Sequence, residues 1–407
     1  MGREFERWIG TAGGAAAALL LGAGAVMAGE WDFSAEVSLE PRLFFEQPRY
    51  EGQLTDLQLS GVFEAEIEWE SEDRAWEAIL IPWARLDAED DDRSHVDLRE
   101  GYLRWIGDAW EVRAGLGKVF WGVTESRHLV DIINQTDAVE DIDEEDKLGQ
   151  PMVEITTIRN WGTLRAWVLP GFRERTFPGE RGRLRGPFTV DKDQAQYESA
   201  DEERRIDGAL RYSNVFGDFD VGVSAFHGTS REPRLGFNPT KQQFFPIYDV
   251  ITQGGLDVQY TTGPWLWKFE GIVREGQGET FGAVTGGFEY TFFGITETGA
   301  DLGVLLEYHH DGRDPAEAPI TPFDEDVFIG ARLALNDVQD TSILVGGIVD
   351  AEDGTTSSLI EAERRFGDNW TGEVEGRFFS NVGDDANDPL TFSQDDSHLL
   401  LRVTRYF

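Results

Sequence analysis

Charged side chains gather at three places in this sequence where they could act on ions and polar solutes. The first is a set of glutamates at every second position, Glu64, Glu66, Glu68 and Glu70. The second is an acidic run within 122–149, and the third is a basic run within 171–203. Opposed charges across a narrow, water-filled passage would create a transverse field that orients dipolar solutes. The residue types therefore predict electrostatic selection.

Side chains suited to bond-breaking chemistry are scarce. The sequence has no cysteine, which excludes thiolate metal sites and cysteine nucleophiles, and it has only six histidines. His227 lies three residues before Ser230, and Ser397 directly precedes His398, but adjacent positions on a strand face opposite sides. Neither pair has an acidic residue at a spacing that would orient the histidine. We therefore expect no enzyme.

The four glutamates belong to a strand of unusual length. Apolar and polar residues alternate from Leu57 to Glu70, which is the period of a β-strand with one apolar and one wet face. Globular strands usually run for only about 5–6 residues. Comparable segments recur about 18 times and predict an all-β chain of about 18 strands, at 31–45, 54–70, 74–87, 95–105, 110–121, 150–158, 160–170, 204–213, 217–227, 254–261, 264–276, 280–293, 299–310, 324–336, 340–350, 356–366, 368–380 and 396–407. Sixteen strands is the nearest alternative, because 95–105 and 150–158 are the weakest of these segments.

The connections between these segments alternate in length. Every second one is a tight turn, such as SED at 71–73 or FGDN at 366–369, and the others include long polar stretches such as 228–253 and 381–395. Short turns at one end and long loops at the other are typical of a transmembrane antiparallel β-barrel with periplasmic turns and extracellular loops. A soluble sandwich has no reason to keep this alternation over the whole chain.

The N-terminus predicts export. Residues 1–28 combine two arginines, an Ala/Gly/Leu run and the small-residue site Val26-Met27-Ala28, which is the pattern of a cleaved signal peptide. A transmembrane anchor is the alternative. Residues 29–407 are then expected to form one barrel domain. Eight tryptophans near short turns would form a ring at one membrane interface, namely Trp69, Trp76, Trp105, Trp110, Trp161, Trp265, Trp267 and Trp370.

Two segments resemble bacterial outer-membrane proteins. The last strand, SHLLLRVTRYF, ends on Phe407 and resembles the terminal aromatic signature of that class, with Arg405 as a departure. The segment 97–122, DLREGYLRWIGDAWEVRAGLGKVFWG, followed by HLVDIINQTD, is similar to porin-like proteins that carry a polar loop next. The resemblance implies a porin fold and location in the cell outer membrane, and it leaves the solute open.

In such a barrel the alternating glutamates would face the lumen, together with Arg332. We expect one or both charged loops to fold inward and form a constriction, acidic on one side and basic on the other. The alternative is that they stay outside and pair with each other or with lipid-bound cations. The acidic candidates are Asp137, Glu140, Asp141, Asp143 and Glu144, and the basic candidates are Arg173, Arg175 and Arg181. The acidic run lacks the spacing and glycine of an EF-hand, which leaves loose divalent cation binding as the only cofactor-like possibility.

The expected function is that of an outer-membrane porin for passive diffusion of small hydrophilic solutes or ions, with a weak preference for cations. A net charge of −41 argues against nucleic acid as a partner. The expected partners are outer-membrane lipid, lipopolysaccharide and small hydrophilic solutes, with a homotrimer possible. An outer-membrane barrel hydrolase and a secreted β-rich binding or adhesion protein are the alternative functions.

Overall fold

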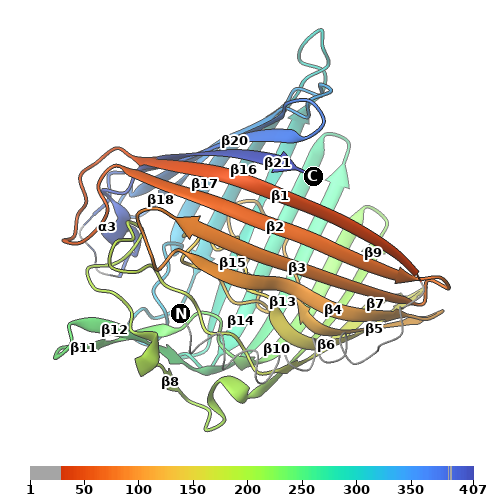
Figure 1. The fold of residues 1–407 in the computed structure, drawn as a ribbon, viewed down its shortest axis with the longest axis horizontal. Helices are drawn as coiled ribbons and strands as arrows, with labels where there is room; N and C mark the ends of the chain where they lie inside the picture. The colour runs from red at the N-terminus through yellow and green to blue at the C-terminus, as the bar shows by residue number, and fades with distance from the viewer. Residues whose placement is uncertain (1–28, 384, 386) are drawn as a thin grey trace.

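The computed structural model describes residues 29–383, 385 and 387–407, so the predicted signal peptide lies outside the described residues. Eighteen strands form one antiparallel sheet (Figure 1). Those of the first half are β1 (Gly29–Phe44), β2 (Leu57–Ser71), β3 (Trp76–Asp87), β4 (His95–Ile106), β5 (Trp110–Gly117), β6 (Gln150–Arg159), β7 (Gly162–Pro170), β9 (Ile206–Phe216) and β10 (Phe219–Thr229). Those of the second half are β13 (Val250–Thr262), β14 (Trp265–Glu275), β15 (Phe281–Phe292), β16 (Asp301–Asp311), β17 (Glu325–Ala334), β18 (Ser342–Asp350), β19 (Thr356–Arg365), β20 (Trp370–Ser380) and β21 (His398–Tyr406).

The sheet closes on itself. Each strand pairs with its neighbours in sequence, and β1 pairs with both β2 and β21, where Glu36 lies opposite Tyr406. The predicted all-β antiparallel barrel of 18 strands is therefore confirmed. The alternative of 16 strands is wrong, because the two weakest segments are β4 and β6 of the barrel. Closure leaves no strand edge free, so every strand meets a partner on both sides.

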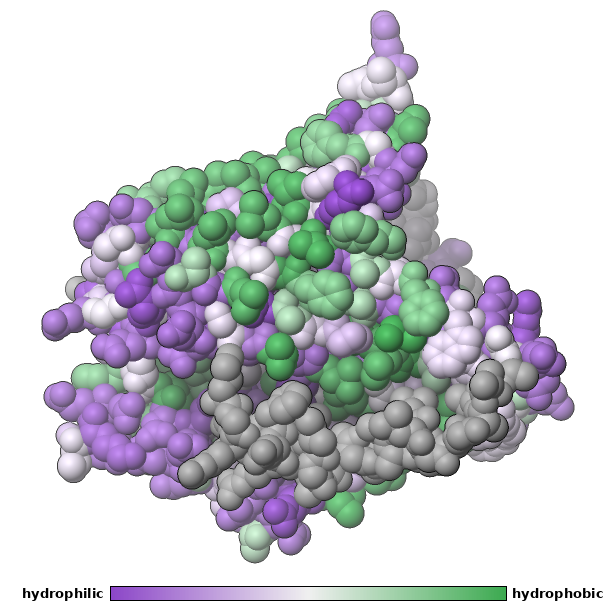
Figure 2. Space-filling model, viewed as in Figure 1, coloured by the Kyte–Doolittle hydropathy of each residue, from purple (hydrophilic) through white to green (hydrophobic). Residues whose placement is uncertain are grey.

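The period of two in β2 decides which way its side chains point. Leu57, Leu59 and Phe63 are exposed on the outer face, whereas Gln58 and Ser60 on the other parity are buried toward the interior. Figure 2 shows apolar side chains over the wall that begins with β1 and β2, and polar side chains at the end with the long loops. Apolar side chains outside and polar side chains inside are the reverse of the arrangement in a soluble protein. This arrangement suits a barrel whose outer wall meets hydrocarbon.

The two faces of one strand, β3, could not be told apart in the sequence, because Ile79 and Ile81 share the parity of its charged residues Glu77 and Arg85. Segment 74–87 has three apolar residues in a row, and the corresponding β3 shows an irregularity between Ile81 and Pro82 in its pairing with β4. Proline lacks the N–H that a ladder needs and is tolerated at bulges. The extra residue belongs to β4, because Ile81 lies opposite Glu100 whereas Pro82 lies opposite Leu98. The inward parity therefore changes along β4, and it stays the same along β3, where Glu77 and Arg85 share it.

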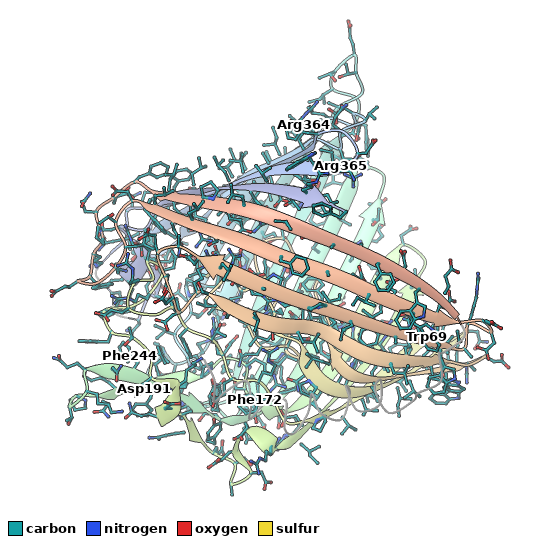
Figure 3. The ribbon with its side chains drawn as sticks, in the orientation of Figure 1. Trp69, Phe172, Asp191, Phe244, Arg364 and Arg365 are labelled. Atoms are coloured by element: carbon teal, nitrogen blue, oxygen red, sulfur yellow. The ribbon has the colours of Figure 1, made fainter. Side chains whose placement is uncertain are left out.

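The two ends of the barrel differ as the connection lengths predict. Exposed tryptophans lie at the short-turn end, including Trp76, Trp105, Trp110, Trp161, Trp267 and Trp370, whereas Trp69 is buried there. At the other end, loops form a small sheet that the sequence did not reveal, made of β8 (Gln196–Tyr197), β11 (Arg234–Asn238) and β12 (Gln243–Tyr248). Figure 3 shows Trp69 near the short-turn end, with Phe244 and Asp191 at the loop end.

The remaining elements are single turns in the long loops. They are the 3₁₀ turns η2 (Lys192–Gln194) and η3 (Glu202–Arg204) and the α-helical turn α3 (Leu390–Ser393). Among the described residues, no helix has the length and apolar character needed to cross a membrane.

Candidate functional site

The connection between β5 and β6, residues 118–149, lies inside the barrel and is called here the inward loop. Glu270 of β14 accepts hydrogen bonds from the backbone N–H groups of Val123 and Thr124, at 2.6 and 3.0 Å. Glu307 of β16 accepts two more from the following two N–H groups, at 2.7 and 3.0 Å. Five strands separate β5 from β14 around the wall. The loop must therefore cross the interior to reach these glutamates.

Apolar packing fixes the middle of the inward loop. Val130 and Ile133 are fully buried, and they belong to a cluster with Met152 of β6, Phe226 of β10 and Ile272 of β14. Burying such a side chain contributes about 1.5–3 kcal/mol relative to exposure in water. The loop is thus packed as a second layer against one side of the wall.

The acidic part of the inward loop, residues 137–146, faces arginines from strands other than those that hold the apolar cluster. Its ion pairs bring together residues far apart in sequence. They are Asp141 with Arg42 at 2.7 Å, Glu140 with Arg85 at 2.5 Å, Asp137 with Arg99 at 2.6 Å and Asp143 with Arg377 at 2.6 Å. The arginines belong to β1, β3, β4 and β20. Charge pairing therefore ties this part of the loop to the wall.

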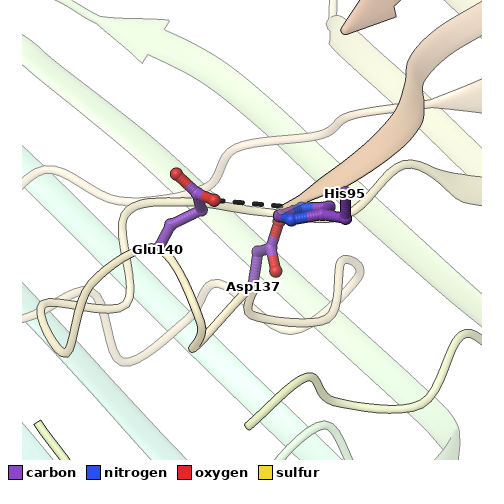
Figure 4. Close-up of side chains that lie close together, drawn as sticks. All are labelled: His95, Asp137 and Glu140. Carbon is purple, nitrogen blue, oxygen red and sulfur yellow. Dashed lines mark ion pairs between the residues drawn. The ribbon is translucent and has the colours of Figure 1, made fainter. Parts of the chain in front are cut away.

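His95, at the start of β4, meets the same acidic segment. Its Nε2 lies 3.7 Å from Asp137 and 3.8 Å from Glu140 (Figure 4). Burial raises the pKa of Asp137, but His95 and Arg99 outweigh it and hold the pKa below its usual value. Two further guanidinium groups approach Glu140. The three side chains in Figure 4 could offer ligands to a metal ion, but so many arginines nearby disfavour a cation there.

A cavity of about 290 Å³ lies between the acidic segment and the wall. It is lined by four guanidinium groups and six carboxylates, from Arg42, Arg85, Arg93, Arg402, Glu140, Asp141, Asp143, Glu145, Asp146 and Glu375. Burial, with the charge of Glu140, raises the pKa of Asp146 to about 6. Burial and the charge of Asp141 raise the pKa of Asp143 well above its usual value. The cavity therefore has opposed charges across it and an excess of acid.

A second cavity, of about 420 Å³, lies under the start of the inward loop. Cations outnumber carboxylates in its lining, which includes Arg104, Arg113, Lys118, Arg165 and Arg211 beside Glu111 and Glu154. Lys118 forms no ion pair with any residue that the structure describes. Trp121 and Trp167 add aromatic surface. The interior thus has a mixed-charge region and a mainly basic region on the two sides of the loop.

The predicted lumen residues lie on several levels of the barrel. Glu64, Glu66 and Glu68 share the inward parity of β2. Glu70 lies near the short turn, where Arg74 approaches it at 3.6 Å. Arg332 of β17 forms an ion pair with Glu125 of the inward loop and lies 3.8 Å from Glu289.

The predicted basic residues lie at the long-loop end. Arg175 pairs with Glu144 of the inward loop at 2.9 Å, so the structure brings these two candidates together. Arg173 instead pairs with Asp97 of β4 at 2.8 Å, and Arg181 pairs with the exposed Glu89. The next two arginines of the run tie loops together, because the buried Arg183 bonds to Asp396 at 2.7 Å and Arg185 bonds to backbone carbonyls.

The arginines that face the acidic segment were missed in the sequence. Arg42, Arg85 and Arg402 are isolated residues on three different strands, so no local run marks them. One signal was available, because Arg42 shares its parity in β1 with the buried Ser38 and Glu40. Parity alone places these groups inside the barrel, but it cannot say that the acidic loop meets them.

The two histidine–serine pairs do not form a hydrogen-bonded dyad. The ring of His227 bonds to a threonine hydroxyl at 3.0 Å and to an arginine at 2.9 Å. The Ser230 hydroxyl donates to the carbonyl of Glu232 at 2.9 Å. Ser397 accepts from a backbone N–H, and His398 bonds to a backbone carbonyl. A serine nucleophile requires its base within hydrogen-bond reach, which neither pair provides.

Comparison with known proteins gives structural likeness only. No protein-family profile matches the chain. No curated protein matches it either. A variant of the Rh. blastica porin has 10% identity and a TM-score of 0.43, and the match covers 93% of this chain and all of that one. The OmpT outer membrane protein of Vibrio cholerae, in a trimer form, has 11% identity and a TM-score of 0.45 with the same coverage, 93% of this chain and 100% of that one.

At these identities and TM-scores, what the chain does must be argued from its own residues. The wall closes through the pairing of β1 with β21, its outer face is apolar, and a charged connection packs across the inside. The chain folds as a closed β-barrel of 18 antiparallel strands whose interior is crossed by a charged loop.

Proposed function

We propose that the protein is an outer-membrane porin through which small hydrophilic solutes and ions diffuse passively. The observation that carries the proposal is the acidic segment of the inward loop, held opposite arginines of the wall across a polar cavity. Passive selection needs only a water-filled path of limited width with fixed charges along it. No bond has to be made or broken, and the proposal includes no cofactor.

The proposed selectivity is a weak preference for cations. Six carboxylates and four guanidinium groups line the cavity beside the acidic segment, so its formal charge is −2. The cavity on the other side of the loop has five cationic side chains and two carboxylates, which opposes the preference. The chain as a whole carries −41, and this field concentrates cations near both mouths. The balance favours cations by a small factor.

The proposed location in the outer membrane is supported by the apolar outer face of the barrel wall. Its exposed apolar side chains, which include Phe33, Leu39, Phe63, Val273 and Ile329, would be costly to hydrate over so wide a surface. Lipid and lipopolysaccharide are the proposed partners of this wall and of its loop end. A homotrimer stays a prediction, which sedimentation of the detergent-solubilised protein would test.

A secreted β-rich binding or adhesion protein is disfavoured by this apolar wall. A barrel hydrolase that uses His227 with Ser230, or Ser397 with His398, is disfavoured because the members of each pair bond to other groups. The two alternatives predict different results in purification and in activity assays. A protein that stays soluble and monomeric without detergent, with no heat-dependent shift on a denaturing gel, would contradict the barrel in lipid. Hydrolysis of lipid or peptide that disappears in Ser230→Ala would support the hydrolase.

Liposome swelling tests the proposed function directly. Liposomes that contain the refolded protein are placed in isosmotic solutions of neutral sugars of increasing size. We expect swelling with small sugars and a cut-off as size rises, because the inward loop narrows the passage. Swelling no faster than in protein-free liposomes, for every sugar, would contradict passive diffusion.

A further inference from the structure

Three aspartates meet at the long-loop end of the barrel, away from the inward loop's acidic segment. Asp326 is the second residue of β17 and lies directly opposite Asp350, the last residue of β18. Asp324 ends the connection that leads into β17. One carboxylate oxygen from each of the three lies within 4.8 Å of the others. These residues are called here the aspartate triad.

The triad contains a buried carboxylate with one oxygen that lacks a partner. Asp326 is only 2% exposed, and among the residues that the structure describes no donor bonds to its Oδ2. Among the described residues, none of the ion pairs includes a member of the triad. An unpaired carboxylate away from water costs several kcal/mol. A second carboxylate directly across the strand pair adds repulsion.

Two other buried carboxylates of this barrel, by contrast, have hydrogen-bond or ion-pair partners. Glu270 is fully buried and accepts hydrogen bonds from backbone N–H groups and from a threonine hydroxyl. Glu40 is 3% exposed and pairs with Arg85 and Arg402. Glu270 and Glu40 therefore have donating or positive partners, whereas the Oδ2 of Asp326 has none among the described residues.

The charged groups around the aspartate triad leave its negative charge unneutralised and so favour binding of a cation. The positive charge of Arg127 acts on Asp326, but its guanidinium group is already bound to Asp311 at 2.6 Å and to the Phe323 carbonyl at 3.2 Å. Asp388, in the last long loop, also belongs to this acidic neighbourhood. Its burial, together with the charges of Asp353, Asp350 and Asp324, raises its pKa to about 6.

We propose that Asp324, Asp326 and Asp350 bind one calcium ion. Calcium accepts carboxylate oxygens at about 2.3–2.6 Å in flexible arrangements, so two of its ligands can lie up to about 5 Å apart. Magnesium requires about 2.0–2.1 Å and nearly ideal octahedral geometry, and it is usually held by only one or two carboxylates, so a site of three carboxylates favours calcium. Asp324 is exposed, and this gives the ion a route in from the long-loop end. Water completes the coordination.

The ion would link the connection 312–324, through Asp324, to the ends of β17 and β18, through Asp326 and Asp350. It would also neutralise repulsion between Asp326 and Asp350, which the fold otherwise leaves uncompensated. This proposal does not depend on the proposed transport function, because binding is measured without any current. It also differs from loose divalent binding at 137–146, where arginines already pair with the carboxylates.

Calcium titration of the refolded full-length protein tests the site. The protein is stripped with EDTA, exchanged into chelator-free detergent buffer and titrated calorimetrically with calcium chloride, then with magnesium chloride. We expect one saturable calcium site, at least tenfold weaker binding of magnesium, and a higher unfolding temperature with calcium than with EDTA. The double variant Asp326→Asn and Asp350→Asn should lose at least tenfold in calcium affinity and lose the calcium-dependent shift.

Two controls keep the result specific. Asp340→Asn changes an exposed aspartate in a turn at the short-turn end and should leave calcium binding unchanged. The double variant must still show the heat-dependent gel shift of the folded barrel, and it should be at least as stable as wild type in EDTA because the repulsion is removed. Calcium binding of unchanged stoichiometry and affinity in the folded double variant would overturn the proposal, as would no saturable binding by wild type at millimolar calcium. Loss of binding in Asp143→Asn, with the triad variant unaffected, would place the ion in the inward loop instead and also overturn it.

Discussion

Replacing Arg402 with glutamine should make the passage more selective for cations. Arg402 lines the cavity beside the acidic segment, and its side chain is 34% exposed, so it can be changed with little disturbance of the core. Its buried partner Glu40 keeps a second guanidinium, that of Arg85 at 2.5 Å. The formal charge of the cavity lining falls from −2 to −3 when one of its four guanidinium groups is lost.

The size of the effect follows from the dimensions of the cavity. A volume of about 290 Å³ places an ion at its centre about 6 Å from the charged groups that line it. One unit charge at about 6 Å in water contributes about 0.7 kcal/mol, and screening in about 0.1 M salt reduces this to about 0.4 kcal/mol. A cation gains and an anion loses this amount. The ratio of cation to anion permeability should therefore rise about fourfold.

Reversal potentials across a salt gradient in planar bilayers measure this ratio. Arg365→Gln serves as the matched control, because Arg365 pairs with the exposed Asp340 near a short turn and lies outside the cavity lining. Its permeability ratio should equal that of wild type. A ratio that is unchanged in Arg402→Gln, or one that moves toward anions, would refute the placement of this arginine beside the ion path.

Three further predictions concern the inward loop. Lowering the pH from about 7 to about 5 should reduce the cation preference, because Asp146 has a pKa raised to about 6 by burial and by Glu140 and becomes neutral below it; reversal potentials that do not change with pH would contradict this. Arg85→Gln should lower the free energy of unfolding by about 1.5–3 kcal/mol, because it removes charged hydrogen bonds to the buried Glu40 and Glu140, which keep only Arg402 and the more distant Arg93. A loss below about 1 kcal/mol in denaturant titration in detergent would refute it. Ile133→Ala should lower the free energy of unfolding by about 2–5 kcal/mol, because it leaves a cavity in the loop's apolar packing. It should also increase the noise of the channel current. Channels with wild-type noise and stability would show that this packing does not hold the loop in place.

The barrel itself could be predicted because its signal is local. Alternation along β2 and turns such as 71–73 are properties of a few neighbouring residues, and lipid and water on opposite faces of the wall enforce them. Strand ends were less predictable. The segment 110–121 was expected to be one strand, but β5 stops at Gly117, where the chain turns into the interior.

The course of the long loops could not be predicted in the same way. The inward loop is positioned by Glu270 and Glu307, which are more than a hundred residues away in sequence, and neither stands out among so many carboxylates. The acidic run 137–146 was recognised by its composition. Apart from Arg175, its basic partners were not, because one arginine from each of several strands becomes a cluster only when the barrel closes. The run at 173–185 looked like the natural partner, yet Arg183 and Arg185 hold loops together instead.

Recordings of single channels test the central claim most directly, namely that a charged loop narrows a water-filled passage through the barrel. The refolded protein is inserted into a planar bilayer, and the conductance of single insertion events and the reversal potential across a potassium chloride gradient are measured. The account predicts discrete, stable conductance steps and a reversal potential displaced slightly toward that of potassium. Folded protein that inserts without conducting, or a channel that clearly prefers chloride, would contradict it.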